Sequence, residues 1–138
     1  MSDASSRVSG RISIDTSLHE FYKELSDGSD PEKTPFRSMK DIFMLAACLG
    51  YQRGQARPIA GSKRQIFHWQ QFSAQVDEPI LKAIAIATTG DIQVLSDQER
   101  IIQIAEEFAN AGIEELRLQI VDHPEQPLWA LISLLRTM

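Results

Sequence analysis

The segment SDQERIIQIAEEFANAG, residues 96–112, carries the clearest helix signal in the chain. Ser96 and Glu99 have the spacing of a capping box, in which each side chain accepts a hydrogen bond from the backbone N–H of the other. Apolar residues then recur three and four positions apart, which predicts a buried face, while Glu106 and Glu107 are expected to point into water. Gly112 should end or bend the helix. The predicted buried face comprises Ile101, Ile102, Ile104, Ala105 and Phe108.

Four further segments show helical periodicity, and two of them carry clear end signals. Ser38 can accept a hydrogen bond from the backbone N–H of Asp41, whose carboxylate also suits a helix N-terminus. Gly50 is a suitable residue to cap the C-terminus of the same helix. Pro127 suits the first turn of the last helix, because the missing N–H costs nothing there. The four segments are residues 18–25, 38–50, 77–87 and 127–135, and a shorter amphipathic piece covers residues 113–121.

The order of these segments predicts a mainly α protein. We expect a single compact helical domain of five or six helices over residues 16–138, with at most a small β-hairpin near residues 51–72. Within that stretch, residues 65–72 fit either a strand or a helix, and a short extended segment is the favoured interpretation. Residues 1–15 are rich in Ser, Asp and Arg, so we expect them to form a mobile N-terminal tail.

The composition is typical of a soluble protein. Of the 138 residues, 43% are hydrophobic, which is enough apolar material for a core. The single cysteine, Cys48, excludes an internal disulfide and suits a reducing compartment. The first residues lack the basic start and apolar stretch of a secretory signal, and no apolar run approaches the roughly 20 residues that span a bilayer. We therefore expect a cytoplasmic protein with no membrane association.

Charge is sorted along the chain. The net charge is −5, but residues 1–36 carry −3, residues 37–64 carry +5 and residues 65–138 carry −7. In the middle segment, six cations stand against a single anion, Asp41. Sorting of this kind bears on partners and association rates rather than on the fold.

No catalytic or metal-binding motif appears in the sequence. Six residues separate Gly54 from Gly61, and Ser62 precedes Lys63, whereas a P-loop needs four intervening residues and a Lys followed by Ser or Thr. The histidines stand alone, without a second ligand at a metal-binding spacing. Cys48 lies on an apolar helix face, where a buried, inert thiol is the favoured interpretation. We expect a protein that is not an enzyme and that binds no metal or cofactor.

The basic segment contains the candidate binding residues. Its cations can reach phosphate groups, and an aromatic side chain beside them can stack on bases. From this feature alone, a solvated loop that keeps the domain soluble is the favoured interpretation. Contact with nucleic acid, or with an acidic protein surface such as the anionic half of another copy, are functional alternatives that the sequence does not separate. The candidate nucleic-acid or partner-binding residues are Arg37, Lys40, Arg53, Arg57, Lys63, Arg64 and Trp69.

Three stretches in a fixed order resemble a known family. They are KDIFMLAACLGY (residues 40–51), followed by a Gly/Arg/Pro loop; IAIA (84–87), with Gly90, Asp91 and Leu95; and IAEEFANAGI (104–113). This order resembles that of the small accessory proteins associated with bacterial DNA phosphorothioation (Dnd) systems, over about residues 36–118. Residues 106–112 are the most telling piece, although Phe108 and Ala111 stand where the family is expected to have a Tyr and a second Gly.

The resemblance implies a role beside a DNA sulfur-modification or linked restriction system that defends against foreign DNA, and it transfers no catalytic residue. It favours a non-enzymatic accessory or adaptor protein whose basic loop contacts DNA or an acidic partner. Candidate partners are DNA, protein components of a modification or restriction complex, and a second copy of the chain. The alternative is a protein–protein interaction module with no nucleic-acid contact, for which residues 128–135 with Trp129 are the candidate surface, although core packing is favoured for them.

Overall fold

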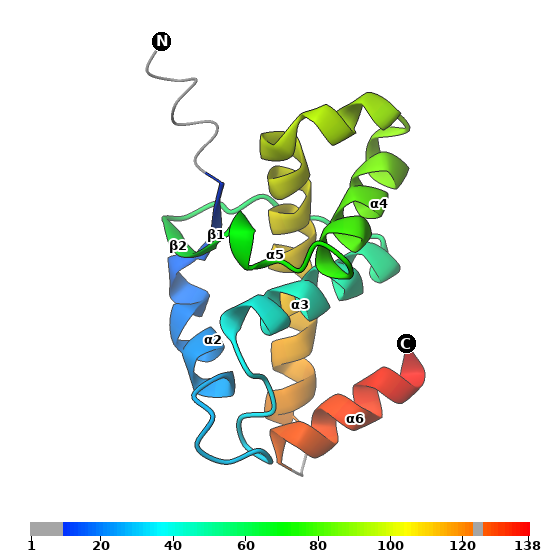
Figure 1. The fold of residues 1–138 in the computed structure, drawn as a ribbon. Helices are drawn as coiled ribbons and strands as arrows, with labels where there is room; N and C mark the ends of the chain where they lie inside the picture. Colours follow the sequence, from blue (N-terminus) through cyan, green and yellow to red (C-terminus); the bar gives the residue numbers. More distant parts are fainter. Residues whose placement is uncertain (1–9, 123–125) are drawn as a thin grey trace.

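The computed structural model describes residues 10–122 and 126–138. Over these residues the chain forms five α-helices and two β-strands, so the predicted mainly α class is confirmed (Figure 1). None of the helices in this described part has both the length and the apolar character needed to cross a membrane. The elements are β1 (Arg11–Asp15), α2 (His19–Leu25), α3 (Met39–Arg53), β2 (Lys63–His68), α4 (Asp77–Thr89), α5 (Gln98–Asp122) and α6 (Pro127–Thr137), with short 3-10 helices at Thr16–Leu18, Trp69–Gln71 and Ile92–Ser96.

Helix α5 is the longest element, and α3, α4, α6 and β1 all contact it. Its closest partner is α3, and the two helices meet at glycines. A Cβ atom on Gly50 would overlap the carbonyl oxygen of Phe108, and a Cβ atom on Gly112 would overlap the carbonyl oxygen of Ala46. The prediction that Gly50 caps a helix is therefore wrong, and α5 does not end at Gly112. Both glycines lie inside helices, where the lack of a side chain lets the two backbones touch.

The helix ends follow local signals in most cases. The backbone N–H of Asp41 donates to Ser38 Oγ over 3.4 Å, which confirms the predicted N-cap of α3. The same helix runs past Gly50 to Arg53 and is capped by Gly54, whose φ of 67° is in the left-handed region. The capping box at Ser96 is wrong: Asp97 Oδ1 accepts from the N–H of Arg100, one position further along the chain. Pro127 does occupy the first turn of α6, as predicted.

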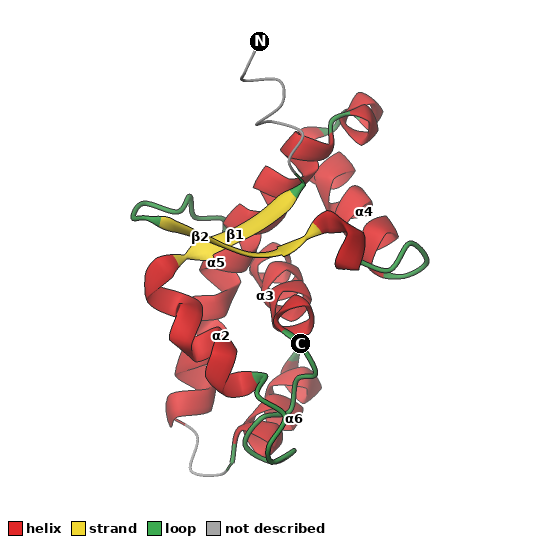
Figure 2. Ribbon diagram, turned by 60° about the vertical axis from the view of Figure 1, so that its left-hand side comes forward, coloured by secondary structure: helices red, strands yellow, loops and turns green. Residues whose placement is uncertain are grey.

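Strands β1 and β2 form a two-stranded antiparallel sheet (Figure 2). The mobile tail predicted for residues 1–15 is wrong over Arg11–Asp15, because Ile12 and Ile14 point into the core and are 1% and 5% exposed. Residues 1–9 lie outside the described part of the chain. The extended conformation favoured for residues 65–72 is confirmed as far as His68, where a 3-10 turn begins. The partner strand comes from the N-terminal segment rather than from within residues 51–72.

A bulge in β2 gives the two ends of this strand different environments. Ile12 pairs with Phe67 and Ser13 pairs with Gln65, so Ile66 is the extra residue. Phe67 thereby enters the core, with its ring centroid 5.7 Å from that of Phe43. Ahead of the bulge, Gln65 and Lys63 instead line a polar cleft together with Ser13. One inserted residue thus separates the strand into a core-forming end and a solvent-facing, basic end.

Candidate functional site

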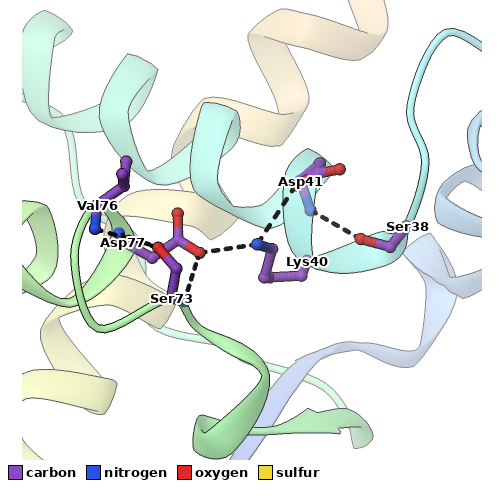
Figure 3. Close-up of polar contacts among 6 residues, drawn as sticks. All are labelled: Ser38, Lys40, Asp41, Ser73, Val76 and Asp77. Carbon is purple, nitrogen blue, oxygen red and sulfur yellow. Dashed lines mark hydrogen bonds and ion pairs between the residues drawn. The ribbon is translucent and has the colours of Figure 1, made fainter.

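Lys40, one of the predicted contact residues, is committed to an internal ion pair (Figure 3). Its Nζ lies 2.8 Å from Oδ2 of the buried Asp77 at the start of α4, and 3.6 Å from Asp41 Oδ1. The hydrogen bond to Asp77 raises the pKa of Lys40. Burial by itself would raise the pKa of Asp77, but the bonds from Lys40 and from the N–H of Ser73 hold it below its ordinary value. Lys40 therefore joins α3 to α4.

The network around Asp77 also replaces an ordinary N-cap. The N–H groups of Val76 and Asp77 both donate to Ser73 Oγ, at 3.1 and 3.0 Å, while Asp77 Oδ2 accepts from the N–H of Ser73 at 2.9 Å (Figure 3). These bonds fix the start of α4 at Asp77. The first buried apolar residue of the helix, Leu81, follows four positions later. The basic side chain of Lys40 is part of this structural unit and is not offered to a ligand.

Two further predicted contact residues have structural partners. Arg53 Nε lies 2.8 Å from Glu115 Oε2, so this ion pair joins the end of α3 to α5. Trp69 is half-buried, and its ring lies edge-on to Phe72 with centroids 5.3 Å apart. The free guanidinium and the exposed stacking ring expected from the sequence are thus both engaged within the fold.

The remaining predicted cations are exposed. Arg57, Lys63 and Arg64 lie on the loop between α3 and β2 and on the first part of β2. Within the part of the chain that the structure describes, none of these three side chains forms an ion pair with a carboxylate. Arg37 is also exposed, but it precedes α3 and so lies at the opposite end of that helix from the loop. The structure therefore leaves three of the seven predicted residues exposed on one stretch of the chain, from the loop after α3 to the start of β2.

The basic loop is ordered because α5 anchors it. The N–H of Arg57 donates to the carbonyl oxygen of Glu107 at 2.9 Å. Asn110 Nδ2 donates to the carbonyl oxygens of Arg57 and Pro58, at 3.0 and 3.2 Å. At the far end of the loop, the N–H of Thr16 donates to the carbonyl oxygen of Ser62 at 3.0 Å. These backbone contacts hold the loop in place without using its charged side chains.

Asn110 is a positioning residue that the sequence reasoning missed. It is 9% exposed and lies in the interior of α5, where Asn is unfavourable unless its amide finds specific partners. An Asn among the apolar residues of a strongly periodic helix is the signal that could have identified it. Without knowledge of which loop lies opposite, that signal does not name the partners.

A cleft of about 430 Å³ lies between the sheet and the N-terminal half of α5. Three basic and three acidic side chains line it, and these residues come from β1, β2, α5 and the turn before α5. Two of the basic residues, Arg11 and Arg100, were not among the predicted site residues. The lining comprises Arg11, Ser13, Lys63, Gln65, Asp97, Glu99, Arg100, Ile102, Gln103 and Glu106.

Glu106 lies at the buried side of this cleft, so the prediction that it points into water is wrong. It is 8% exposed, and its Oε2 accepts a hydrogen bond of 2.7 Å from the N–H of Ser13 on β1. Burial raises its pKa to about 7, against the opposing effects of the Ser13 hydrogen bond and of the positive charge on Lys63. The prediction failed because the residues that cover Glu106 belong to β1, and the sequence pattern of β1 is that of a mobile tail.

Cys48 is the other reactive residue type considered from the sequence. It is half-buried on α3, and burial raises the pKa of its thiol. A raised pKa lowers the thiolate fraction at neutral pH, which does not favour a nucleophile. The chemistry available at the site is therefore that of the cleft and the loop: cations that can hold anionic groups, amides that can form hydrogen bonds, and one buried carboxylate.

A family model described as DNA sulphur modification system-associated protein 4 matches residues 11–137 of the chain. No curated protein and no solved structure gives a significant match.

Proposed function

The chain belongs to the family of DNA sulphur modification system-associated protein 4, and on that premise we propose that it is a non-enzymatic accessory protein whose basic loop contacts the DNA backbone. In this proposal it acts in the bacterial cytoplasm beside the enzymes that modify DNA or restrict foreign DNA. It contributes positioning on DNA and contacts with other components, not a chemical step. The contact residues are Arg57, Lys63 and Arg64, without Lys40 and Arg53.

One observation carries the proposal: three exposed cations, without an ion pair in the described residues, lie on the loop after α3 and on the adjoining start of β2. The loop is fixed to α5 through its backbone at Arg57 and Pro58, and the start of β2 is fixed by its pairing with β1. Cations that contact phosphates release counterions, which supplies most of the affinity of sequence-independent binding. A fixed loop presents its charges without the cost of ordering them on binding. Lys40 and Arg53 are bound to Asp77 and Glu115 and would have to break those pairs first.

The test is fluorescence anisotropy of a labelled DNA duplex at several salt concentrations. The wild-type affinity should fall steeply with salt. Replacing Arg57, Lys63 and Arg64 with Ala should weaken binding and reduce the slope of log K against log salt by roughly 0.9 for each phosphate that the variant no longer neutralises. The matched control replaces three other exposed cations with Ala, so that the change in net charge is the same. These are Lys23, Lys33 and Arg136.

Equal binding by the two triple variants would contradict a specific role for the loop. The loss of affinity would then depend only on the change in net charge, which is the same in both variants. Absence of binding by the wild-type chain at low salt would contradict direct DNA contact altogether. Circular dichroism of each variant checks that the helices are intact, and retaining Arg53 keeps the ion pair that joins α3 to α5.

A second candidate function, protein–protein interaction without DNA contact, is favoured by helix α6. Although most of its residues are apolar, only Ala130 and Leu134 are buried, while Trp129 and Leu135 are 44% and 50% exposed. Large apolar side chains exposed on a helix are typical of a docking element. Trp129 is already oriented, since its Nε1 donates to Glu32 Oε2 at 2.9 Å.

A further inference from the structure

We propose that the cleft between the sheet and α5 binds an amino-bearing nucleobase, with the Glu106 carboxylate accepting a hydrogen bond from the exocyclic amino group and Lys63 and Arg100 contacting the attached phosphate. The inference rests on the proposed function in one respect, because a DNA strand is the expected source of the base. A free nucleotide has the same chemistry and is the other source that the experiment distinguishes.

The hydrogen bonding of Glu106 leaves an acceptor for a ligand. Its Oε2 accepts from the N–H of Ser13, and among the described residues none donates to Oε1. Glu106 lines the cleft although it is 8% exposed, so this carboxylate belongs to the wall of the cleft rather than to the open surface. Among the described residues, the only buried side-chain N or O atom without a hydrogen-bond partner is the hydroxyl of Tyr22, so Oε1 of Glu106 is not sealed from solvent. It is therefore open to a donor on a ligand in the cleft.

The size and charge of the cleft fit a nucleotide better than a simple anion. Its volume of about 430 Å³ falls within the range of about 300–1,000 Å³ found for small-molecule sites. Lys63 and Arg100 supply positive charge for a phosphate, and Gln65 supplies an amide for ring nitrogen and carbonyl groups. Gln103 also lines the cleft, but its Nε2 donates to Glu107 Oε2 at 3.3 Å. A bare anion would be repelled by the carboxylates on the same walls. A ligand that joins an anionic group to a hydrogen-bond donor is complementary to both kinds of residue.

A carboxylate selects among bases by their exocyclic groups. Cytosine presents an amino group at C4 where uracil and thymine present a carbonyl oxygen, and acidic side chains accept from that amino group in known complexes. Against uracil, the Oε1 acceptor of Glu106 would face another acceptor. The cleft should therefore bind cytidine nucleotides in preference to uridine nucleotides.

The test is a titration of the full chain with cytidine monophosphate and with uridine monophosphate at pH 8, followed by chemical shifts of the backbone amides. At this pH the carboxyl of Glu106, with its pKa raised to about 7, is mainly ionised and only accepts hydrogen bonds. The charges that face it are those of Lys63, Glu99 and Glu107, with Arg11, Asp97 and Arg100 elsewhere on the cleft walls. We expect a Kd for the cytidine nucleotide roughly tenfold lower, since Oε1 faces a donor in the cytidine complex and another acceptor in the uridine complex.

The variant Glu106→Gln distinguishes ligand recognition by Glu106 from a purely structural role, because only recognition predicts a change in nucleotide preference. The N–H of Ser13 can donate only to the amide oxygen of the new side chain, which leaves the amide NH₂ group facing the cleft. A donor then replaces an acceptor, and the preference should reverse in favour of the uridine nucleotide. Glu107→Gln is the matched control, because it removes the same charge from the adjacent residue, which does not line the cleft. It should keep the wild-type preference.

Equal affinity for the two nucleotides in the wild type, or an unchanged preference in Glu106→Gln, would overturn the inference. A short oligodeoxycytidine and a short oligothymidine, titrated in parallel, separate the two sources of the base. A cytosine preference seen only with mononucleotides identifies a free nucleotide as the ligand. Salt-dependent duplex binding through the loop with no base preference in the cleft would leave the proposed function standing and this inference contradicted.

Discussion

The carboxylate of Glu106 gives the stability of the protein an unusual pH dependence. Its pKa is about 7 in the folded state against 4.5 for an ordinary Glu, so the folded state holds the proton more tightly between these values. Stability should therefore fall as pH rises from 4.5 to 7, and the cost should be fully present above pH 7. Below pH 4.5 the carboxyl is protonated in both states and contributes no difference.

Glu106→Gln should remove this cost while keeping the hydrogen bond from Ser13. We expect the variant to be more stable than the wild type at pH 8, by up to about 3 kcal/mol for a shift of roughly 2.5 units at about 1.4 kcal/mol per unit. The advantage should shrink toward zero at pH 4. Urea denaturation at the two pH values measures it. A stability difference that is the same at pH 4 and pH 8 would show that ionisation of Glu106 is not the cause.

Single residues also show where sequence reasoning stops. Ser38 could be assigned as an N-cap because its partner, the N–H of Asp41, is three residues away. Glu106 and Asn110 could not be assigned, because their partners, Ser13 and the Arg57–Pro58 carbonyls, are 93 and about 50 positions away along the chain. Polar residues on a helix are usually solvated, and only the fold reveals which of them are covered.

Among the elements, α3 and α5 meet so closely that their glycines cannot be changed without moving a helix. Gly112→Ala should destabilise the protein by about 3 kcal/mol or more, because the new methyl group would overlap the carbonyl oxygen of Ala46 and the helices would have to separate. Thermal denaturation measures the loss. Gly61→Ala is the matched control, since a Cβ there meets nothing closer than 3.8 Å. Similar stability of the two variants would contradict the close crossing.

The same two helices explain how much of the fold could be predicted. Helical periodicity and local caps are properties of neighbouring residues, so all five α-helices could be anticipated from the sequence. Gly50 and Gly112 look like helix ends in isolation, and only the crossing of two helices explains why they lie inside them. Strand β1 was missed for a related reason: five residues with two isoleucines have too short a pattern to distinguish from a tail without the partner strand.

At the scale of the whole molecule, the fold does not keep the three differently charged segments of the sequence apart, because one cleft is lined by residues from all of them. The cleft collects Arg11 from the acidic N-terminal segment, Lys63 from the basic segment and Arg100 from the acidic C-terminal segment. It places them beside Asp97 and Glu99. Candidate site residues chosen by linear charge therefore include two that serve the fold, Lys40 and Arg53, and omit two that line the cleft, Arg11 and Arg100.

Helix α6 leads to a prediction about assembly. If its exposed apolar face packs against another copy of the chain, the wild type should sediment at high concentration with a mass above that of the 15.5 kDa chain. Leu135→Asp should then reduce this association by placing a charge on the face, at little cost to stability because Leu135 is 50% exposed. Ser133→Asp adds the same charge at an exposed polar position of α6 and should leave association unchanged. A monomer at every concentration would rule out this use of the face.

The bond from Ser13 to Glu106 also places the candidate site in the order of folding. It closes the chain over 93 positions, and the pairing of Thr16 with Ser62 closes it over 46. Closing so long a loop costs chain entropy before any contact repays it, whereas the turns of α3 and α5 form from neighbours. We therefore expect docking of β1 to be a late event on folding. In the native ensemble, the loss of this one strand would open the cleft and expose the buried carboxylate without unfolding the helical body.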